Sequence, residues 1–279
     1  MTTKPIVVGA DGSAEALRAV EWAAREAALR GAPLRIVSAA EIIPRMTMPP
    51  QAVESETVAA RIRQNRDQAL ATAAKAAAAM APDLPIGTDP LEGPPAQAVT
   101  RSGSGALMLV VGSQGSSAIA ALALGSVSRY AALHASCPVV VVREETMAVH
   151  RLVAVGIRDP ADCAAALAFA FEEAQLRKAR LLAVHAWHSP DPRVLNTWAA
   201  SELAGLLNDW RGKFPDVDAS HDIVHGHPGR VLADLSARAD LVVLGRHGRN
   251  GRTPPGPARI AHAVVSHAHG PVVTVPSEG

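Results

Sequence analysis

Residues 107–142 read LMLVVGSQGSSAIAALALGSVSRYAALHASCPVVVV, and this stretch decides the fold. The apolar run Leu107–Val111 predicts a buried strand that stops at Gly112. After a polar loop, a helix is expected from the turn at Gly125 to about Ser136, and the valines at the end predict another strand. Strands that alternate with helices in this way indicate a parallel α/β sheet, because parallel strands need crossover connections.

The glycines and serines of this stretch suit the binding of phosphate. Glycine lacks a Cβ, so backbone N–H groups can converge on an anion, and Ser126 and Ser128 add hydroxyls at the positive end of a helix. The loop has no lysine, which excludes a Walker A loop, and it does not match the G-x-G-x-x-G pattern of dinucleotide folds. The alternative interpretation is a connection whose glycines serve only its turns.

The spacing of these residues resembles the ATP-binding signature of the universal stress protein family, G-x2-G-x9-G-[ST] followed by Val-Ser. The resemblance implies ATP as the ligand, with Mg²⁺ considered as its companion ion. It implies nucleotide contacts from the loop, from the turn after the first strand and from strand ends that line an adenine pocket. These residues are Ala10, Asp11, Ala39 (or its neighbour Ala40), Val111, Gly112, Gln114, Gly115, Gly125, Ser126, Val127 and Ser128.

The segments before this stretch extend the alternation. Strands are expected at 4–9, 34–40 and 84–89, helices at 14–30, 53–81 and 95–101, and a loop at 42–52. Ser13 is the expected N-cap of the first helix and Gly31 its end, with Leu17, Val20, Ala24, Ala27 and Ala28 on one face. The pattern predicts a doubly wound sheet that binds ligands beyond the carboxyl ends of its strands.

Asp11 follows the first strand, so the topology predicts that it lies near the glycine loop. By itself, an Asp in an Asp-Gly-Ser sequence is more typical of a helix cap. Combined with the downstream signature, a carboxylate that accepts hydrogen bonds from ribose or adenine is the favoured interpretation.

The chain then repeats itself. Strand sequences near 152–156, 181–187, 241–245 and 270–275 match those of the first half, with 14 fewer residues between the second and fourth strands. A repeat of this length predicts tandem domains, 1–146 and 147–279, rather than a solenoid. By resemblance, each is a Rossmann-like, five-stranded parallel sheet of the adenine nucleotide alpha hydrolase type.

The second copy departs from the signature. Gly245 and Gly248 are kept, but Ala258, Arg259 and Ala261 replace the glycine and the two serines, and Arg158 stands in the place of Asp11. Either ATP binding by this copy is lost or weakened, so that it serves as a structural partner for the first copy, which we prefer, or arginines replace the cradle with guanidinium contacts to phosphate. In the second case the expected contacts are Gly245, Gly248 and Arg259, with further arginines at 246, 249 and 252. A solvated basic loop is the simplest alternative.

Most of the 11 histidines lie in the second copy, and His185, His188, His225, His227 and His247 are expected near strand ends. A His-x-His pair on an extended segment could bind a metal, but no acidic residue or cysteine accompanies it at ligand spacing. We therefore predict surface or hydrogen-bonded histidines and no metal site.

Composition narrows the class of protein. Lys+Arg number 27 against 26 Asp+Glu, and aromatic residues make up 3%, which argues against nucleic-acid binding. No apolar run is long enough to span a membrane, and no signal peptide is evident, so a cytoplasmic location is expected. The two cysteines, Cys137 and Cys163, are expected to be reduced and buried.

The resemblance implies a nucleotide-dependent regulator of stress response or growth arrest, with the two domains paired within the chain, a homodimer and an unidentified protein partner. One alternative is an enzyme of the same fold, either a slow ATP hydrolase or a nucleotidyl transferase. No carboxylate pair or Ser-His-Asp set supports it. Another is an interaction module that needs no nucleotide, suggested by the altered second copy.

Overall fold

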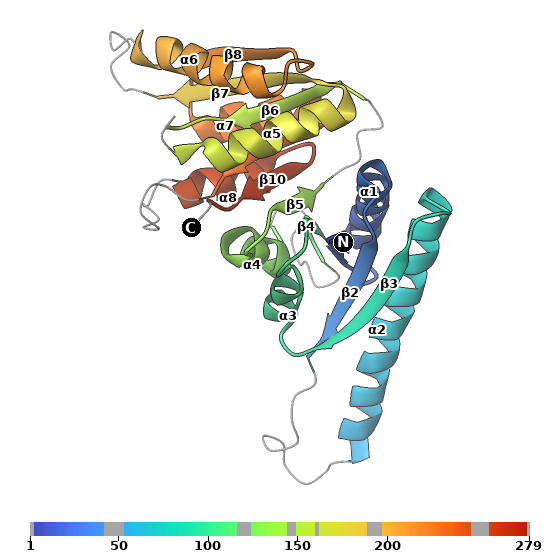
Figure 1. The fold of residues 1–279 in the computed structure, drawn as a ribbon. Coiled ribbons are helices and arrows are strands. Elements are labelled where there is room, and N and C mark those ends of the chain that lie inside the picture. The colour runs from blue at the N-terminus through green and yellow to red at the C-terminus, as the bar shows by residue number, and fades with distance from the viewer. Residues whose placement is uncertain are drawn as a thin grey trace. The chain divides into compact units, whose positions relative to one another are not determined.

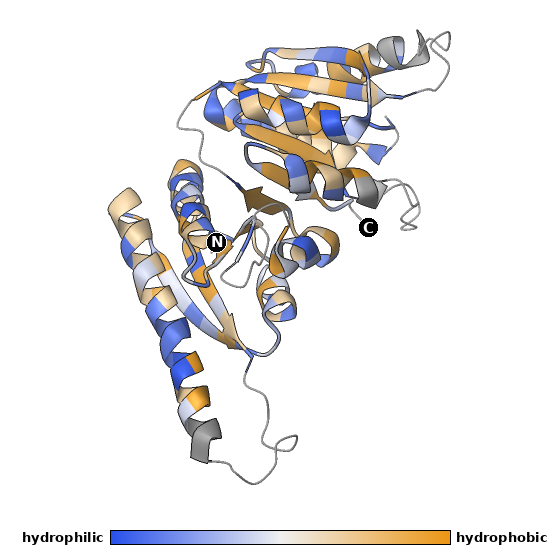
Figure 2. Cartoon of the chain, turned by 180° about the vertical axis from the view of Figure 1, so that it is seen from behind, coloured by the Kyte–Doolittle hydropathy of each residue, from blue (hydrophilic) through white to orange (hydrophobic). Residues whose placement is uncertain are grey.

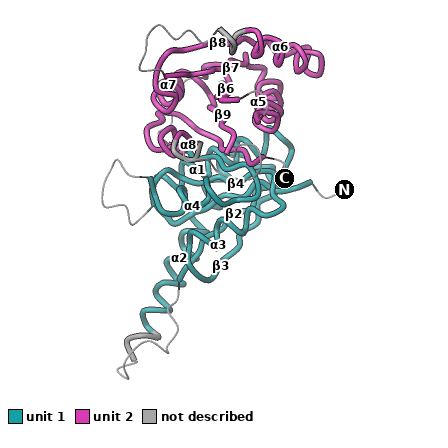
Figure 3. The backbone as a smooth tube through the Cα atoms, turned by 90° about the vertical axis from the view of Figure 1, so that its left-hand side faces the viewer, with its two compact units in different colours: residues 1–142 teal, residues 143–279 magenta. Residues whose placement is uncertain are grey.

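The computed structural model describes residues 3–41, 53–115, 124–143, 149–159, 162–188, 197–246 and 257–277, with side chains described except at 53–56, 197–200 and 257–259. The chain divides into two compact units, Met1–Val142 and Arg143–Gly279 (Figure 3). The domain boundary that the sequence predicts, between 146 and 147, lies outside the described residues, as does the predicted loop at 42–52.

The first unit is a five-stranded parallel sheet with the strand order β3-β2-β1-β4-β5. Its strands are β1 (Ile6–Gly9), β2 (Leu34–Ala40), β3 (Ile86–Glu92), β4 (Met108–Gly112) and β5 (Val139–Val142). Its helices are α1 (Ala14–Arg30), α2 (Val53–Met80), α3 (Pro95–Ser102) and α4 (Ser126–His134). The order reverses between β1 and β4, which is the switch point where such sheets bind ligands.

Helices cover both faces of this sheet (Figure 1). α1 and α2 pack together on one face, and α3 and α4 pack together on the other. β1, β4 and β5 are therefore buried on both sides, and their apolar side chains form the core. In Figure 2, which colours the backbone by hydropathy, the orange of hydrophobic residues is prominent in the strands.

α1 shows how local sequence sets the helix bounds. The Ser13 hydroxyl accepts a hydrogen bond from the Ala16 N–H, and Gly31 ends the helix in the left-handed conformation at φ 60°. The buried face is lined mainly by alanines, which allow the helix to approach the sheet closely. Ala28 is exposed, so its predicted place on that face is wrong, whereas Val20, Ala24 and Ala27 are buried as predicted.

β3 begins and ends later than the predicted range 84–89. It runs from Ile86 to Glu92 and includes Pro90. Proline removes a ladder donor, but within this unit β3 is an end strand that pairs with β2, and end strands tolerate proline.

The second unit repeats the arrangement, with the parallel order β8-β7-β6-β9-β10. Its strands are β6 (Leu152–Gly156), β7 (Arg180–Trp187), β8 (Ala219–His225), β9 (Leu241–Gly245) and β10 (Val272–Val275). Its helices are α5 (Ala164–Arg177), α6 (Thr197–Lys213), α7 (Pro228–Leu235), the 3-10 turn η3 (Ser236–Arg238) and α8 (Pro257–His267). The predicted fold class, two tandem doubly wound domains, is confirmed.

The strands of the two copies correspond as the sequence repeat predicts, because β1 and β6 end at Gly9 and Gly156, and β4 and β9 end at Gly112 and Gly245. The shortening of the second copy falls mainly in one helix, because α2 has 28 residues and its counterpart α6 has 17. Within the described ranges, none of the helices is both long and apolar enough to cross a membrane.

Candidate functional site

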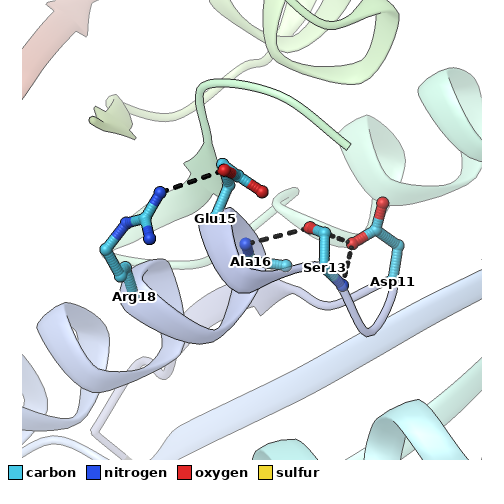
Figure 4. A network of polar contacts seen from close by, with 5 residues as sticks. All are labelled: Asp11, Ser13, Glu15, Ala16 and Arg18. Carbon is cyan, nitrogen blue, oxygen red and sulfur yellow. Dashed lines mark hydrogen bonds and ion pairs between the residues drawn. The ribbon is translucent and has the colours of Figure 1, made fainter. Parts of the chain in front are cut away.

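The turn after β1 braces the start of α1. One carboxylate oxygen of Asp11, Oδ1, accepts hydrogen bonds from the Ser13 N–H at 3.0 Å and the Ser13 hydroxyl at 2.6 Å (Figure 4). Gly12 allows this tight turn with its φ of 83°. Ser13 therefore caps α1, while Asp11 orients Ser13.

The other oxygen of Asp11 faces the glycine loop. A Cβ placed on Gly115 would lie 2.7 Å from Asp11 Oδ2, which is closer than real Cβ contacts. The turn after β1 and the loop after β4 thus meet at the switch point, as the topology predicted. A side chain at 115 would displace the carboxylate.

Gly125 brings the second half of the signature to the same place. Its N–H donates to the Ser113 carbonyl at 2.8 Å, and a Cβ on it would lie 3.4 Å from the Gln114 Cα. α4 begins directly afterwards, and Gly125 at its N-cap supplies no side-chain hydrogen bond. The positive end of α4 thus begins beside the loop that faces Asp11.

Gly112 and Ser128 stabilise the packing of β4 against α1 and α4. A Cβ on Gly112 would lie 2.8 Å from the backbone carbonyl carbon and oxygen of Glu15, so only glycine lets β4 end this close to α1. The buried Ser128 hydroxyl donates to the Gly112 carbonyl at 2.5 Å. The sequence could not reveal that this hydroxyl has a partner inside the protein.

The other predicted residues surround the same strand ends. Ala10 is buried and its N–H donates to the Val37 carbonyl at 2.8 Å, while Ala39 is half-buried near the end of β2. Val111 is buried, Val127 is half-buried, and Ser126 is exposed at the first position of α4. Ser126 is thus the signature hydroxyl that faces solvent.

The same position in the second unit has the opposite charge. Arg158 replaces Asp11, its side chain is 48% exposed, and its guanidinium lies 3.4 Å from Asp162 Oδ2. Pro160 stands where Ser13 caps α1, and α5 starts at Ala164, one turn later than the repeat would place it. Gly245 is consequently exposed, whereas its counterpart Gly112 is buried.

Several predicted phosphate contacts of the second unit lie outside the described residues, namely Gly248, Arg249, Arg252 and the side chain of Arg259. His247, one of the histidines expected near strand ends, lies outside them too. Arg246 is described and is buried, with its N–H donating to the Val275 carbonyl at 2.9 Å. It therefore does not belong to a solvated basic loop.

A small pocket that the sequence interpretation missed occupies the switch point of the second unit. Its volume is about 70 Å³, and it opens between the ends of β6, β7 and β9 and the starts of α7 and α8. It is lined mostly by apolar groups: Gly156, Ile157, Arg158, Val184, Ala186, Pro228, Leu232, Leu244, Gly245, Ile260 and Ala261. Two substitutions in the sequence could have indicated this pocket: Leu232 stands in the place of Val99, and Ala261 stands in the place of Ser128.

Four of the five histidines expected near strand ends lie in the described residues, and they are exposed or hydrogen-bonded as predicted. His185 is buried, and its Nδ1 lies 2.9 Å from the Ile157 carbonyl. His188, His225 and His227 are exposed, and the rings of His188 and His227 stack with centroids 4.0 Å apart. Among the described residues, no group of three or more His, Cys, Asp or Glu side chains could hold a metal ion.

Cys163 precedes α5 and is 5% exposed. Burial raises the pKa of its thiol to about 11, and the negative charges of Asp159 and Asp162 add to the rise, while a backbone hydrogen bond opposes it. Such a thiol is protonated at neutral pH and is a poor nucleophile.

The model of the universal stress protein family matches residues 2–143 and 150–276. A universal stress protein of Mycobacterium tuberculosis strain H37Rv is 34% identical over 285 residues, which cover 96% of this chain and 95% of that protein. The crystal structure of a universal stress protein from Archaeoglobus fulgidus superimposes with a TM-score of 0.74 at 14% identity, covering 98% of this chain and 96% of that one. A universal stress protein solved in complex with cAMP is 30% identical, covers 51% of this chain and 98% of its own, and has a TM-score of 0.40.

Proposed function

Because the chain belongs to the universal stress protein family, we propose that its first unit binds ATP and acts in the cytoplasm as a nucleotide-dependent regulator of stress response or growth arrest. The observation that carries this proposal is the meeting of Asp11 and Gly115, where a carboxylate oxygen fills the space of a missing Cβ. A loop that served only as a connection would not need to face a carboxylate in this way.

The geometry suggests a role for each part of the site. Backbone N–H groups at Gly115 and at the start of α4 suit the phosphates, and the exposed Ser126 hydroxyl adds a donor there. Asp11 Oδ2 suits the hydroxyls of ribose, and the half-buried Ala39 offers apolar surface for adenine, with the buried Val111 packed behind the strand ends. In this proposal the phosphates themselves hold any Mg²⁺, whose charge would offset theirs.

The test is the nucleotide content of the natively purified full chain. After denaturation, released ATP, ADP and AMP are quantified per chain for the natural protein and for Asp11→Ala, Ser126→Ala and Arg158→Ala. We expect about one nucleotide per chain, a loss in Asp11→Ala, a weaker hold in Ser126→Ala and no change in Arg158→Ala.

The outcomes separate the alternatives. About two nucleotides per chain would mean that the second unit also binds nucleotide. None, together with no binding of added ATP, would overturn the proposal and favour the interaction module. Phosphate released steadily by the loaded protein would favour the hydrolase. Sedimentation tests the predicted homodimer, and native co-purification tests the protein partner.

A further inference from the structure

We propose that the pocket of the second unit binds a small monocarboxylate with a branched apolar body, held by Arg158. The pocket lies at the switch point of its sheet, where doubly wound folds bind ligands. Its described lining residues all belong to the second unit, so the proposal does not depend on ATP binding in the first unit.

The apolar walls of the pocket favour a ligand with a hydrocarbon part. Val184, Leu232, Leu244 and Ile260 line it, and Ala261 replaces the hydroxyl of Ser128. Leu232 also reaches the backbone of β6, because a Cβ on Gly156 would lie 2.8 Å from its Cδ1. Apolar surface of this kind stabilises a ligand by removing its hydrocarbon from water.

The size of the pocket limits the ligand. Its volume of about 70 Å³ is well below the ~150 Å³ of an engineered apolar cavity that binds benzene. An adenine ring system is larger than benzene, so this pocket does not suit it without rearrangement. A branched body of about four carbons, as in isovalerate, is on the right scale.

Arg158 selects the charge of the ligand. Among the described lining residues it is the cationic one, and its half-exposed side chain stands at the position of Asp11 in the first unit. A guanidinium binds a carboxylate with two parallel hydrogen bonds and discriminates against neutral isosteres. Two carboxylates oppose this, since Asp159 is adjacent in sequence and Asp162 lies 3.4 Å from the guanidinium. A bound carboxylate would therefore compete with Asp162 for Arg158.

The start of α5 leaves the site accessible. In the first unit, the first turn of α1 packs on Gly112, whose Cβ would lie 2.8 Å from Glu15. In the second unit, α5 begins at Ala164, and a Cβ on Gly245 would meet Ala166 only at 3.8 Å. Gly245 lines the pocket and is exposed, so within the described part of the second unit this end of the site is open to a ligand.

The test is methyl NMR of the full chain with labelled Ile, Leu and Val, titrated with isovalerate and with isovaleramide as its neutral analogue. We expect saturable shifts at Leu232, Leu244 and Ile260 with isovalerate, no matching shifts at Val99 and Val111, and binding of the amide about tenfold weaker. Equal binding of acid and amide, or shifts confined to the first unit, would overturn the proposal.

Matched variants locate the ligand. Ala186→Leu, which fills the pocket, should abolish the isovalerate shifts, whereas Ala39→Leu at the equivalent position of the first unit should leave them unchanged. Arg158→Gln should weaken binding about tenfold, with Arg180→Gln, an exposed arginine at the start of β7, as the control.

A charge variant tests the competition for the guanidinium. Asp162→Asn should tighten isovalerate binding several-fold, because it removes the competing carboxylate. Weaker binding in Asp162→Asn, or unchanged binding in Arg158→Gln, would exclude Arg158 as the carboxylate contact. The methyl spectrum of each variant without ligand reports separately on its folding.

Discussion

The two units share a fold and differ where the fold binds ligands. The first unit places a carboxylate, three glycines and an exposed hydroxyl at its switch point, whereas the second places an arginine beside an apolar pocket. The strands keep the same order in both. The difference shows that the sheet tolerates a reversed charge and a lost helical turn at its carboxyl edge, because neither change disturbs the buried strands.

Some residues that both copies retain need not serve the same purpose. Gly112 and Gly245 end equivalent strands, but only Gly112 is in close contact with a helix backbone. A retained glycine is therefore a weak sign of a retained ligand. The following predictions test which residues serve the scaffold and which serve the ligand.

The largest effect is expected from Gly112→Ala. The added Cβ would lie 2.8 Å from the Glu15 backbone, so α1 must move, at a cost of about 2–4 kcal/mol in the free energy of unfolding of the first unit. Gly245→Ala is the matched control and should cost less than about 1 kcal/mol, because its nearest contact is 3.8 Å away. Hydrogen exchange of the β1 and β4 amides measures the first unit separately from the second.

An equal loss of exchange protection in the two variants would contradict this contrast. It would mean that the end of β9 is packed as tightly as the end of β4. Reporting each unit by its own amides is necessary because a two-domain chain does not unfold as a single two-state system.

The second prediction concerns the reactivity of Cys163, the cysteine just before α5. Cys163 occupies the position that corresponds to the first turn of α1, and burial raises the pKa of its thiol from the ordinary 9.0 to about 11. In a Cys137→Ala background, alkylation at pH 8 should be about 100-fold slower in the folded protein than in urea, because about 100-fold less thiolate is present. Asp162→Asn should lower the pKa and speed the reaction.

The raised pKa of the Cys163 thiol also determines how the stability of the second unit changes with pH. The folded state holds the thiol proton more tightly than the unfolded state, so the contribution is fully present below pH 9. It is lost as the pH rises from 9 to about 11. Denaturant titrations of the second unit with Cys163 and with Cys163→Ala should differ by a constant amount below pH 9, because the truncation changes packing at every pH, and the difference should change only between pH 9 and about 11. A difference that changes with pH below pH 8 would contradict the assignment.

Much of the fold could be predicted from sequence because its signals are local. The N-cap at Ser13 and the glycine after Arg30 fix α1, and the predicted bounds of β2, Leu34 and Ala40, are confirmed. The late end of β3 could not be predicted, since proline is normally a breaker and only the pairing shows that β3 is an end strand.

The site was predictable in its topology but not in its contacts. The order of strands requires Asp11 and Gly115 to approach, and they do. The internal partner of the Ser128 hydroxyl and the packing of Gly112 on Glu15 depend on distances between segments, which spacing does not encode. The pocket beside Leu232 was missed because the loss of a signature was interpreted as loss of a site.

The smallest effect is expected from replacing Ser126 or Ser128 with alanine. These two serines lie two residues apart, and we expect one to serve the ligand and the other the scaffold. Ser128→Ala removes the donor to the buried Gly112 carbonyl and should cost about 1–2 kcal/mol in stability of the first unit. Ser126→Ala removes an exposed hydroxyl and should leave stability within about 0.5 kcal/mol while weakening ATP binding about tenfold.

Hydrogen exchange and ATP titration of both variants check this division. Ala261→Ser, which restores a hydroxyl at the equivalent position of the second unit, serves as the control, because it should not create an ATP site beside Arg158 and Leu232. If Ser128→Ala lowered ATP affinity with stability unchanged, its hydroxyl would have to leave the Gly112 carbonyl for the ligand. The scaffold would then rearrange on binding, and the contrast between the two serines would belong only to the ligand-free state.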